Sequence, residues 1–229
     1  DTDGLRFNAM IGTSHNDYGG NDVRGNFLVS NLFNEGTLGA IFSGSYSETD
    51  RKVDNIEHVW ARVDRPEGGE VYSMIESLFK DYDTRRERYA FTGGLSFRPT
   101  YDDEYYVRGS YARFTDDEFR NRLRITWEDG DLETGATDLS GTYSNARIDK
   151  QFRHRVLRNQ LTTVALGGEH NRDNLTFDYV GSYSRGKQTY PNRDEILWRS
   201  NLRPDISYDF SQDANIPIIS LFNNNEHLQ

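Results

Sequence analysis

Cysteine is absent from the 229 residues of the chain, which excludes a disulfide scaffold, a catalytic thiol and a cysteine-ligated metal site. There is also no run of about 18 apolar residues, so the sequence predicts no transmembrane helix. A basic excess is lacking too, because the formal net charge is −10 at pH 7. Since nucleic-acid binding needs a basic surface, we expect no nucleic acid among the partners.

Aromatic residues and glycine are abundant instead. The chain has 14 Tyr, 13 Phe and 20 Gly but only 2 Met, and 34% of its residues are hydrophobic while 28% are charged. Tyrosine-rich chains with many glycines and few helix formers favour β structure. So polar a composition is compatible with a membrane β-barrel, because only one face of each strand in such a barrel is apolar.

Apolar and polar residues alternate most clearly over residues 89–99. One face of this predicted strand carries Tyr89, Phe91, Gly93, Leu95 and Phe97. Pro99 ends the strand because it cannot donate to the ladder, and residues 100–103 predict a turn. The next strand, residues 104–115, has Tyr105, Val107, Gly109 and Tyr111 on one face. The pattern therefore predicts a hairpin with one apolar side.

The same unit recurs twice along the chain. Its first copy has strands at residues 24–33 and 38–46 around a turn at 34–36, and its second has strands at 160–170 and 175–184 around a turn at 171–174. A further alternating stretch covers residues 5–11. The chain therefore has room for about seven or eight strands.

The connections between these hairpins are predicted to be polar loops at residues 14–22, 47–80, 116–155 and from 185 onward. In an antiparallel meander, short turns would then lie at one end and long loops at the other. Outer-membrane barrels have this asymmetry, whereas a soluble sandwich has short or mixed connections. The predicted fold class is all-β, an antiparallel meander that is part of a transmembrane β-barrel with short periplasmic turns and long extracellular loops.

Whole-strand similarity points to one family. Residues 82–99 (YDTRRERYAFTGGLSFRP) and 104–122 (EYYVRGSYARFTDDEFRNR) resemble the barrel of TonB-dependent receptors, the active outer-membrane transporters of Gram-negative bacteria. Residues 24–33 (RGNFLVSNLF) and 37–48 (TLGAIFSGSYSE) resemble an early hairpin of that barrel. The resemblance covers most of residues 1–210 and includes no catalytic motif.

The resemblance implies a transporter of the cell outer membrane that imports a scarce nutrient: a siderophore, an oligosaccharide or a vitamin. Its implied partners are outer-membrane lipid, a plug domain, the remaining barrel strands of the parent chain, TonB and the nutrient, without a cofactor. The family's barrel has about 22 strands, so we expect residues 1–229 to form only part of it, without the plug, the TonB-contacting segment or a closing C-terminal aromatic residue. The chain begins with Asp1 and no signal peptide, which suggests a processed or excised segment.

Several polar groups are candidate sites. Asp116, Asp117 and Glu118 suit a hard cation, but a solvated acidic strand end is favoured because the spaced ligands of a calcium loop are missing. Glu169 and His170 with His154 lack zinc spacing and are interpreted as strand-end residues. Five arginines are expected in the barrel lumen, in ion pairs with acids such as Glu87 or, less favoured, along an anion path: Arg85, Arg86, Arg88, Arg108 and Arg113. The sequence predicts no catalytic, metal-binding or cofactor-binding residue, and no motif identifies a ligand-binding residue. We therefore do not expect an enzyme.

Two alternatives stay open at this point. One is a soluble all-β module that recognises carbohydrate or another ligand through tyrosine and tryptophan (Trp60, Trp127 and Trp198), and the other is a β-rich hydrolase without a supporting motif. The discriminating feature is the apolar strand face, which a membrane barrel leaves without a protein layer and a sandwich covers with a second sheet. For the segment alone we expect an open sheet with two free edges.

Overall fold

The computed structural model describes residues 4–223 and 226–227. Their regular structure consists of antiparallel strands and one 3₁₀ turn, η1 (Trp127–Asp129). The predicted all-β antiparallel class is therefore confirmed. Within the described ranges, no helix is both long and apolar enough to cross a membrane.

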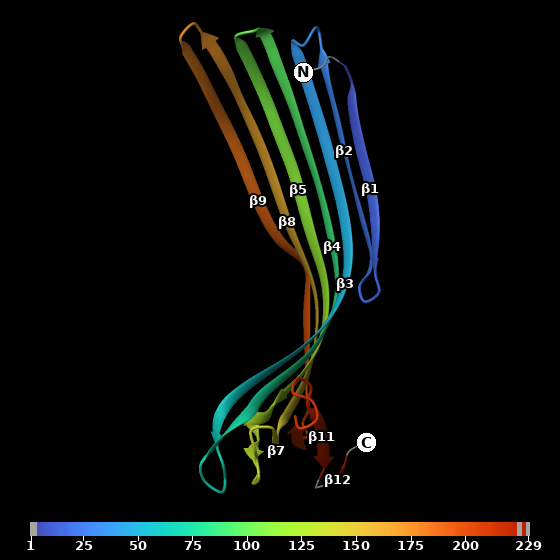
Figure 1. Ribbon diagram of the computed structural model, residues 1–229, viewed down its shortest axis with the longest axis vertical. Coiled ribbons are helices and arrows are strands. Elements are labelled where there is room, and N and C mark those ends of the chain that lie inside the picture. The colour runs from blue at the N-terminus through green and yellow to red at the C-terminus, as the bar shows by residue number, and fades with distance from the viewer. Residues whose placement is uncertain (1–3, 224–225, 228–229) are drawn as a thin grey trace. The chain divides into compact units, whose positions relative to one another are not determined.

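The strands form two sheets (Figure 1). The larger has the order β1-β2-β3-β4-β5-β8-β9. Its members are β1 (Arg6–Asn16), β2 (Gly20–Phe33), β3 (Leu38–Asp64), β4 (Glu70–Thr100), β5 (Asp103–Thr126), β8 (Arg147–Arg172) and β9 (Leu175–Arg199). The smaller has the order β12-β11-β10-β7-β6. Its members are β6 (Asp131–Leu132), β7 (Ser140–Ser144), β10 (Asp205–Asp209), β11 (Ile218–Asn223) and β12 (Glu226–His227).

The chain divides into two compact units. Unit 1 contains Asp1–Lys52, Asp83–Glu118 and Arg155–Arg193, and unit 2 contains Val53–Tyr82, Phe119–His154 and Asp194–Gln229. The strands β3, β4, β5, β8 and β9 contribute residues to both units.

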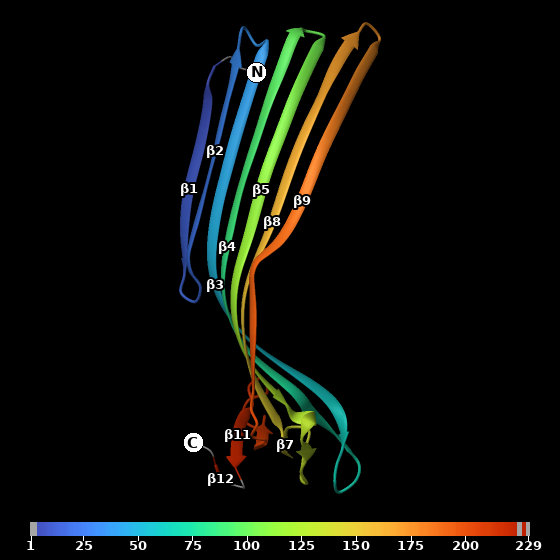
Figure 2. The ribbon, with the colours of Figure 1, turned by 180° about the vertical axis from the view of Figure 1, so that it is seen from behind.

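Unit 1 is a single-layered sheet. All seven strands of the larger sheet contribute to it. Views from opposite sides show these strands side by side, with no other described segment of this unit across either face (Figures 1 and 2). The apolar residues are in register across its first strands, where Phe7 pairs with Val29 and Val29 in turn pairs with Phe42. β1 and β9 each have a single strand neighbour, so the sheet is open at both edges, as the sequence predicted.

The turns of unit 1 agree with the sequence pattern. Asn34, Glu35 and Gly36 have φ angles of 51°, 53° and 88°, and Thr37 N donates to Asn34 O at 3.1 Å. Glycine and asparagine adopt this left-handed backbone conformation more readily than other residues. The segment therefore reverses the chain here. The turns predicted at residues 100–103 and 171–174 are also present but shorter, at residues 101–102 and 173–174.

The predicted long loops are wrong. β3 continues to Asp64 and β4 begins at Glu70, so only residues 65–69 connect them. Of the predicted loop at residues 14–22, only residues 17–19 lie between strands. Of the predicted loop at 116–155, only residues 127–146 lie between β5 and β8. The predicted loop from residue 185 begins within β9, which continues to Arg199. The sequence did not predict these strand extensions because they lack a one-sided apolar pattern. Backbone ladders form them, and cross-strand ion pairs such as Lys80 Nζ–Glu57 Oε1 at 2.7 Å replace apolar packing.

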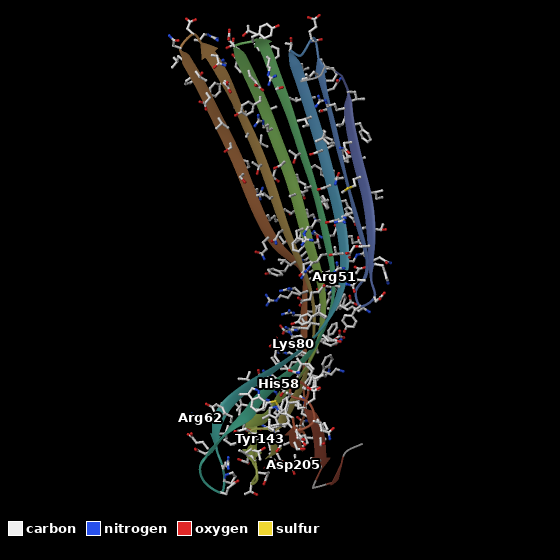
Figure 3. The ribbon with its side chains drawn as sticks, in the orientation of Figure 1. Arg51, His58, Arg62, Lys80, Tyr143 and Asp205 are labelled. Atoms are coloured by element: carbon white, nitrogen blue, oxygen red, sulfur yellow. The ribbon has the colours of Figure 1, made fainter. Side chains whose placement is uncertain are left out.

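Unit 2 has a compact aromatic core that the sequence did not predict. Trp127, Tyr143 and Tyr208 are 0%, 2% and 1% exposed. Their polar atoms bind two buried serines: Ser73 Oγ lies 2.8 Å from Tyr143 Oη and 2.9 Å from Tyr208 Oη, and Trp127 Nε1 donates to Ser77 Oγ at 2.8 Å. Figure 3 labels Tyr143 in this unit. The core therefore combines large apolar burial with satisfied polar groups.

Candidate functional site

One face of the unit 1 sheet is apolar, and no described segment of this unit lies over it (Figures 1 and 2). Ring contacts join neighbouring strands on this face, with centroid distances of 5.6 Å for Phe27–Phe42 and 6.2 Å for Phe42–Phe91. We call it the apolar face, and its main side chains are Phe27, Phe42, Tyr89, Phe91, Leu95, Phe97, Tyr105, Phe177 and Tyr179. Large apolar side chains stay open here: Leu95 is 53% exposed and Phe177 58%. A contiguous apolar surface of this kind marks a contact with lipid or another apolar partner.

The opposite face of unit 1 is polar. Strand alternation places serines, threonines and small residues there, together with Arg88 and Arg108. The guanidinium of Arg88 lies 4.6 Å from the Phe114 ring centroid, and that of Arg108 lies 4.2 Å from the Tyr106 ring centroid. Two hollows of about 330 and 540 Å³ lie along this face.

The five arginines expected in a lumen do not share one face. Arg86 Nε donates to Asp116 Oδ1 at 2.8 Å on the polar face. Arg113 Nη1 instead donates to Tyr89 Oη, at 3.0 Å, on the apolar face, and Arg85 forms a 2.7 Å ion pair with Glu48. The acidic partner of Arg86 is therefore Asp116 and not its neighbour Glu87, and the expectation of a common lumen position is wrong for Arg85 and Arg113.

The acidic segment at 116–118 is not the solvated strand end that the sequence predicts. Asp116 and Glu118 are 6% and 7% exposed and lie within β5. Arg155 Nη2 lies 3.5 Å from Asp116 Oδ2 and 2.9 Å from Glu118 Oε2, so both carboxylates are neutralised by arginine. In the part of the chain that the structure describes, no group of three or more His, Cys, Asp or Glu side chains is arranged to hold a metal.

The two histidines considered for zinc have different surroundings. His170 Nδ1 lies 2.7 Å from Asp103 Oδ1 in unit 1, near the turn at 173–174, which confirms the strand-end interpretation for this residue. His154 belongs to unit 2 and stacks on Phe119, with ring centroids 3.9 Å apart. Its position within β8 corrects the expectation of a strand end.

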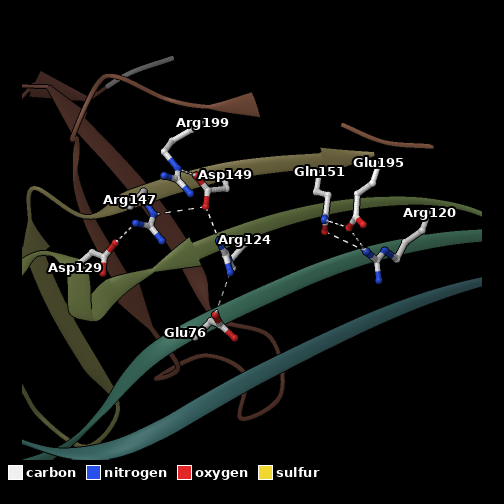
Figure 4. Close-up of polar contacts among 9 residues, drawn as sticks. All are labelled: Glu76, Arg120, Arg124, Asp129, Arg147, Asp149, Gln151, Glu195 and Arg199. Carbon is white, nitrogen blue, oxygen red and sulfur yellow. Dashed lines mark hydrogen bonds and ion pairs between the residues drawn. The ribbon is translucent and has the colours of Figure 1, made fainter. Parts of the chain in front are cut away.

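Unit 2 contains a charged cluster centred on Asp149, which is 1% exposed (Figure 4). Three guanidinium groups face its carboxylate, from Arg124 at 2.7 Å, Arg199 at 3.4 Å and Arg147 at 3.5 Å. Arg147 also pairs with Asp129 at 2.7 Å. Burial alone would raise the pKa of Asp149, but the hydrogen bond from Arg124 and the three positive charges outweigh it, so its pKa lies below the ordinary 3.8.

A second polar group lies on the same face of β5. Arg120 Nη2 donates to Gln151 Oε1 at 3.0 Å and lies 3.7 Å from Glu195 Oε1, and Gln151 Nε2 donates to the same Glu195 oxygen (Figure 4). The sequence carried a signal for this face, because Arg120, Arg122 and Arg124 alternate with uncharged residues. A search for apolar periodicity alone does not detect such a pattern.

The three tryptophans do not form a sugar-binding platform. Trp127 is fully buried, and the Trp60 ring packs against Tyr208 and Phe210 at centroid distances of 5.9 and 5.4 Å. Trp198, on β9, is 51% exposed. Because stacking on a sugar needs an open ring face, only Trp198 and part of Trp60 are accessible for it.

Comparison with known proteins adds no assignment. No protein-family model matches the sequence, and a search of curated proteins finds no match. The functional argument therefore rests on the two unlike faces of unit 1 and the charged clusters of unit 2.

Proposed function

We propose that unit 1 is part of the wall of a transmembrane β-barrel in the outer membrane of a Gram-negative bacterium, and that the chain belongs to a transporter of the TonB-dependent receptor type. The observation that carries this proposal is the uncovered apolar face backed by a polar face with hollows. Barrel strands alternate in this way, with apolar residues toward lipid and polar residues toward the lumen.

Strand lengths support the membrane assignment. A transmembrane strand needs about 9–11 residues, and β1 and β2 have 11 and 14. We assign the turns at residues 34–37, 101–102 and 173–174 to the periplasmic side, because the other ends of β3, β4, β5, β8 and β9 continue into unit 2. The opposite strand ends, which lead into unit 2, are assigned to the extracellular side.

The open edges of the sheet have a consequence in a membrane. Unpaired N–H and C=O groups along β1 and β9 are very unfavourable in lipid, because no water is present to bind them. We infer that further strands pair with both edges in the assembled barrel, and that its polar lumen contains a plug domain. The nutrient, a siderophore, an oligosaccharide or a vitamin, would bind from the extracellular side, and TonB would supply the energy for import.

A soluble carbohydrate-binding module is less well supported. Such a sandwich would cover the apolar face with a second sheet, whereas Phe91 and Phe97 remain 40% and 46% exposed in unit 1. The burial of Trp127 also removes one of the three rings that this alternative relied on.

The experiment compares Phe91→Arg with Thr92→Arg in the protein produced with its export signal. An arginine facing the bilayer midplane costs about 2–4 kcal/mol, so Phe91→Arg is expected to reduce the folded outer-membrane fraction by about tenfold or more. Thr92→Arg is the matched control, because the adjacent residue points to the polar face. Recovery of the wild-type protein in the soluble fraction without detergent, or equal insertion of both variants, would refute the membrane assignment.

A further inference from the structure

Arg122 occupies the middle of a row of three arginines on β5. Alternate residues of a strand share a face and lie roughly 7 Å apart, so the side chains of Arg120, Arg122 and Arg124 project from the same side of unit 2. The charges of Arg120 and Arg124 act on Arg122 strongly enough to contribute to lowering its pKa.

The two outer arginines of the row are engaged. Arg120 bonds Gln151 and lies near Glu195, while Arg124 bonds the buried Asp149 at 2.7 Å and lies 4.0 Å from Glu76. These partners come from β4, β8 and β9, so both guanidinium groups are held in place by neighbouring strands. The outer arginines therefore provide a fixed positive field on either side of Arg122.

Arg122 has no such partner. Among residues 4–223, no carboxylate lies within ion-pair distance of its guanidinium. Its Nε is buried without a hydrogen-bond acceptor, as are those of Arg120 and Arg124, but Arg122 lacks the terminal-nitrogen partners that the other two have. Glu195 and Glu76 are near enough to raise its pKa, but they are the acids already close to Arg120 and Arg124. Burial and the two flanking cations outweigh them, so the pKa of Arg122 is lowered. A half-buried cation with unused donors is thus placed between two like charges.

We propose that Arg122 is the centre of an oxyanion-binding site in unit 2, which takes a carboxylate or phosphate group of a small solute. A planar guanidinium offers two parallel N–H groups that match the two oxygens of such an anion. The bound anion would complete the alternation of charge along this face, where every other arginine of the row already has an acceptor. The site is separate from the apolar face, so it stands even if unit 1 does not lie in lipid.

The site selects against cations and against bulky polyanions. Glu76 and Glu195 border it and would repel a ligand that spreads several negative charges beyond the guanidinium. Arg120 and Arg124 are not expected to release their own partners, because Asp149 and Gln151 are 1% and 8% exposed. A compact group with a single oxyanion is therefore the expected ligand.

The test is calorimetric titration of the whole protein, in detergent if it partitions into membranes and in buffer otherwise, with inorganic phosphate and separately with acetate. We expect saturable binding of at least one of these anions, weakened tenfold or more by Arg122→Gln. Arg62→Gln is the matched control, since Arg62 carries the same charge in the same unit but is exposed and bonded to Tyr72 and Glu70. It should leave the affinity within about twofold.

A fold control separates loss of the site from loss of structure. Arg122→Gln removes a like charge between two arginines, so the variant should unfold at the same or higher urea concentration than the wild type in the absence of anion. Unsaturable or absent binding of both phosphate and acetate to the wild type would overturn the proposal, and so would binding that survives Arg122→Gln unchanged. Neither result depends on whether the apolar face meets lipid.

Discussion

Replacing Asp149 by Asn removes the carboxylate that Arg124, Arg147 and Arg199 share, while keeping the size of the side chain. Removing one partner of a buried ion pair typically costs about 3–5 kcal/mol, because a charge is left uncompensated. Here Arg147 retains Asp129 at 2.7 Å, and the Arg199 side chain is 56% exposed. We therefore expect the lower end of that range, about 3 kcal/mol in the free energy of unfolding of unit 2.

The measurement is urea unfolding followed by tryptophan fluorescence. Trp127 is fully buried in the same unit and reports its opening. The midpoint of Asp149→Asn should fall while the slope of the transition stays unchanged, since the surface exposed on unfolding is the same. Asp131→Asn is the matched control, because Asp131 is exposed on β6 and its substitution should change stability by less than about 0.5 kcal/mol.

The pH dependence of the same variant provides a second check. The folded-state pKa of Asp149 is below the ordinary 3.8, so its contribution to stability is present above 3.8 and is lost as the pH falls toward the folded pKa. The difference between wild type and Asp149→Asn should be constant from neutral pH down to about pH 5 and shrink in more acidic solution. A variant as stable as the wild type at pH 7, or a difference that persists undiminished at the lowest pH where the protein still folds, would refute this account of the cluster.

Three further substitutions and conditions test unit 2. Gly130→Ala would place Cβ on the carbonyl oxygen of Ser144, and we expect a loss of about 1–3 kcal/mol by urea unfolding. Ser77→Ala removes the acceptor of the Trp127 indole N–H, which should cost about 1–3 kcal/mol and change the Trp127 emission; unchanged emission would contradict the bond. Burial lowers the pKa of His58 from 6.5, so folding is favoured above that pH and weakened as the pH falls below it. In His58→Phe, the urea midpoint should change less between pH 7 and pH 5 than it does in the wild type. An equally large change in the variant would assign the pH dependence to another group.

The strands of unit 1 were predictable because their apolar residues lie on one side. Phe91 and Leu95 alternate with small polar residues, and the contacts across β2, β3 and β4 follow that alternation. The continuation of β3 beyond residue 47 was not predictable in the same way. Asp50 and Lys52 precede further charged residues on both faces, so no apolar period remained to distinguish a solvated strand from a loop.

The sequence pattern did not predict the core of unit 2, for a different reason. Trp127 and Tyr143 come from short segments that contain one buried aromatic residue each, and a single large residue carries no period. A signal did exist near the end of the chain, where Ile206, Tyr208 and Phe210 alternate and are all buried. The transporter assignment drawn from the sequence stays a prediction, supported by the uncovered face of unit 1 and open to the arginine test.

The buried Ser73 joins residues that are far apart in the sequence. Its hydroxyl contacts Tyr143, 70 positions away, and Tyr208, 135 positions away. Contacts across such separations form slowly, because long segments must be brought together first. During synthesis, Ser73 can contact Tyr143 once β7 has been made, but its contact with Tyr208 must wait for β10. This one hydroxyl therefore links β4, β7 and β10, and its contacts are complete only after the last of these strands has been made.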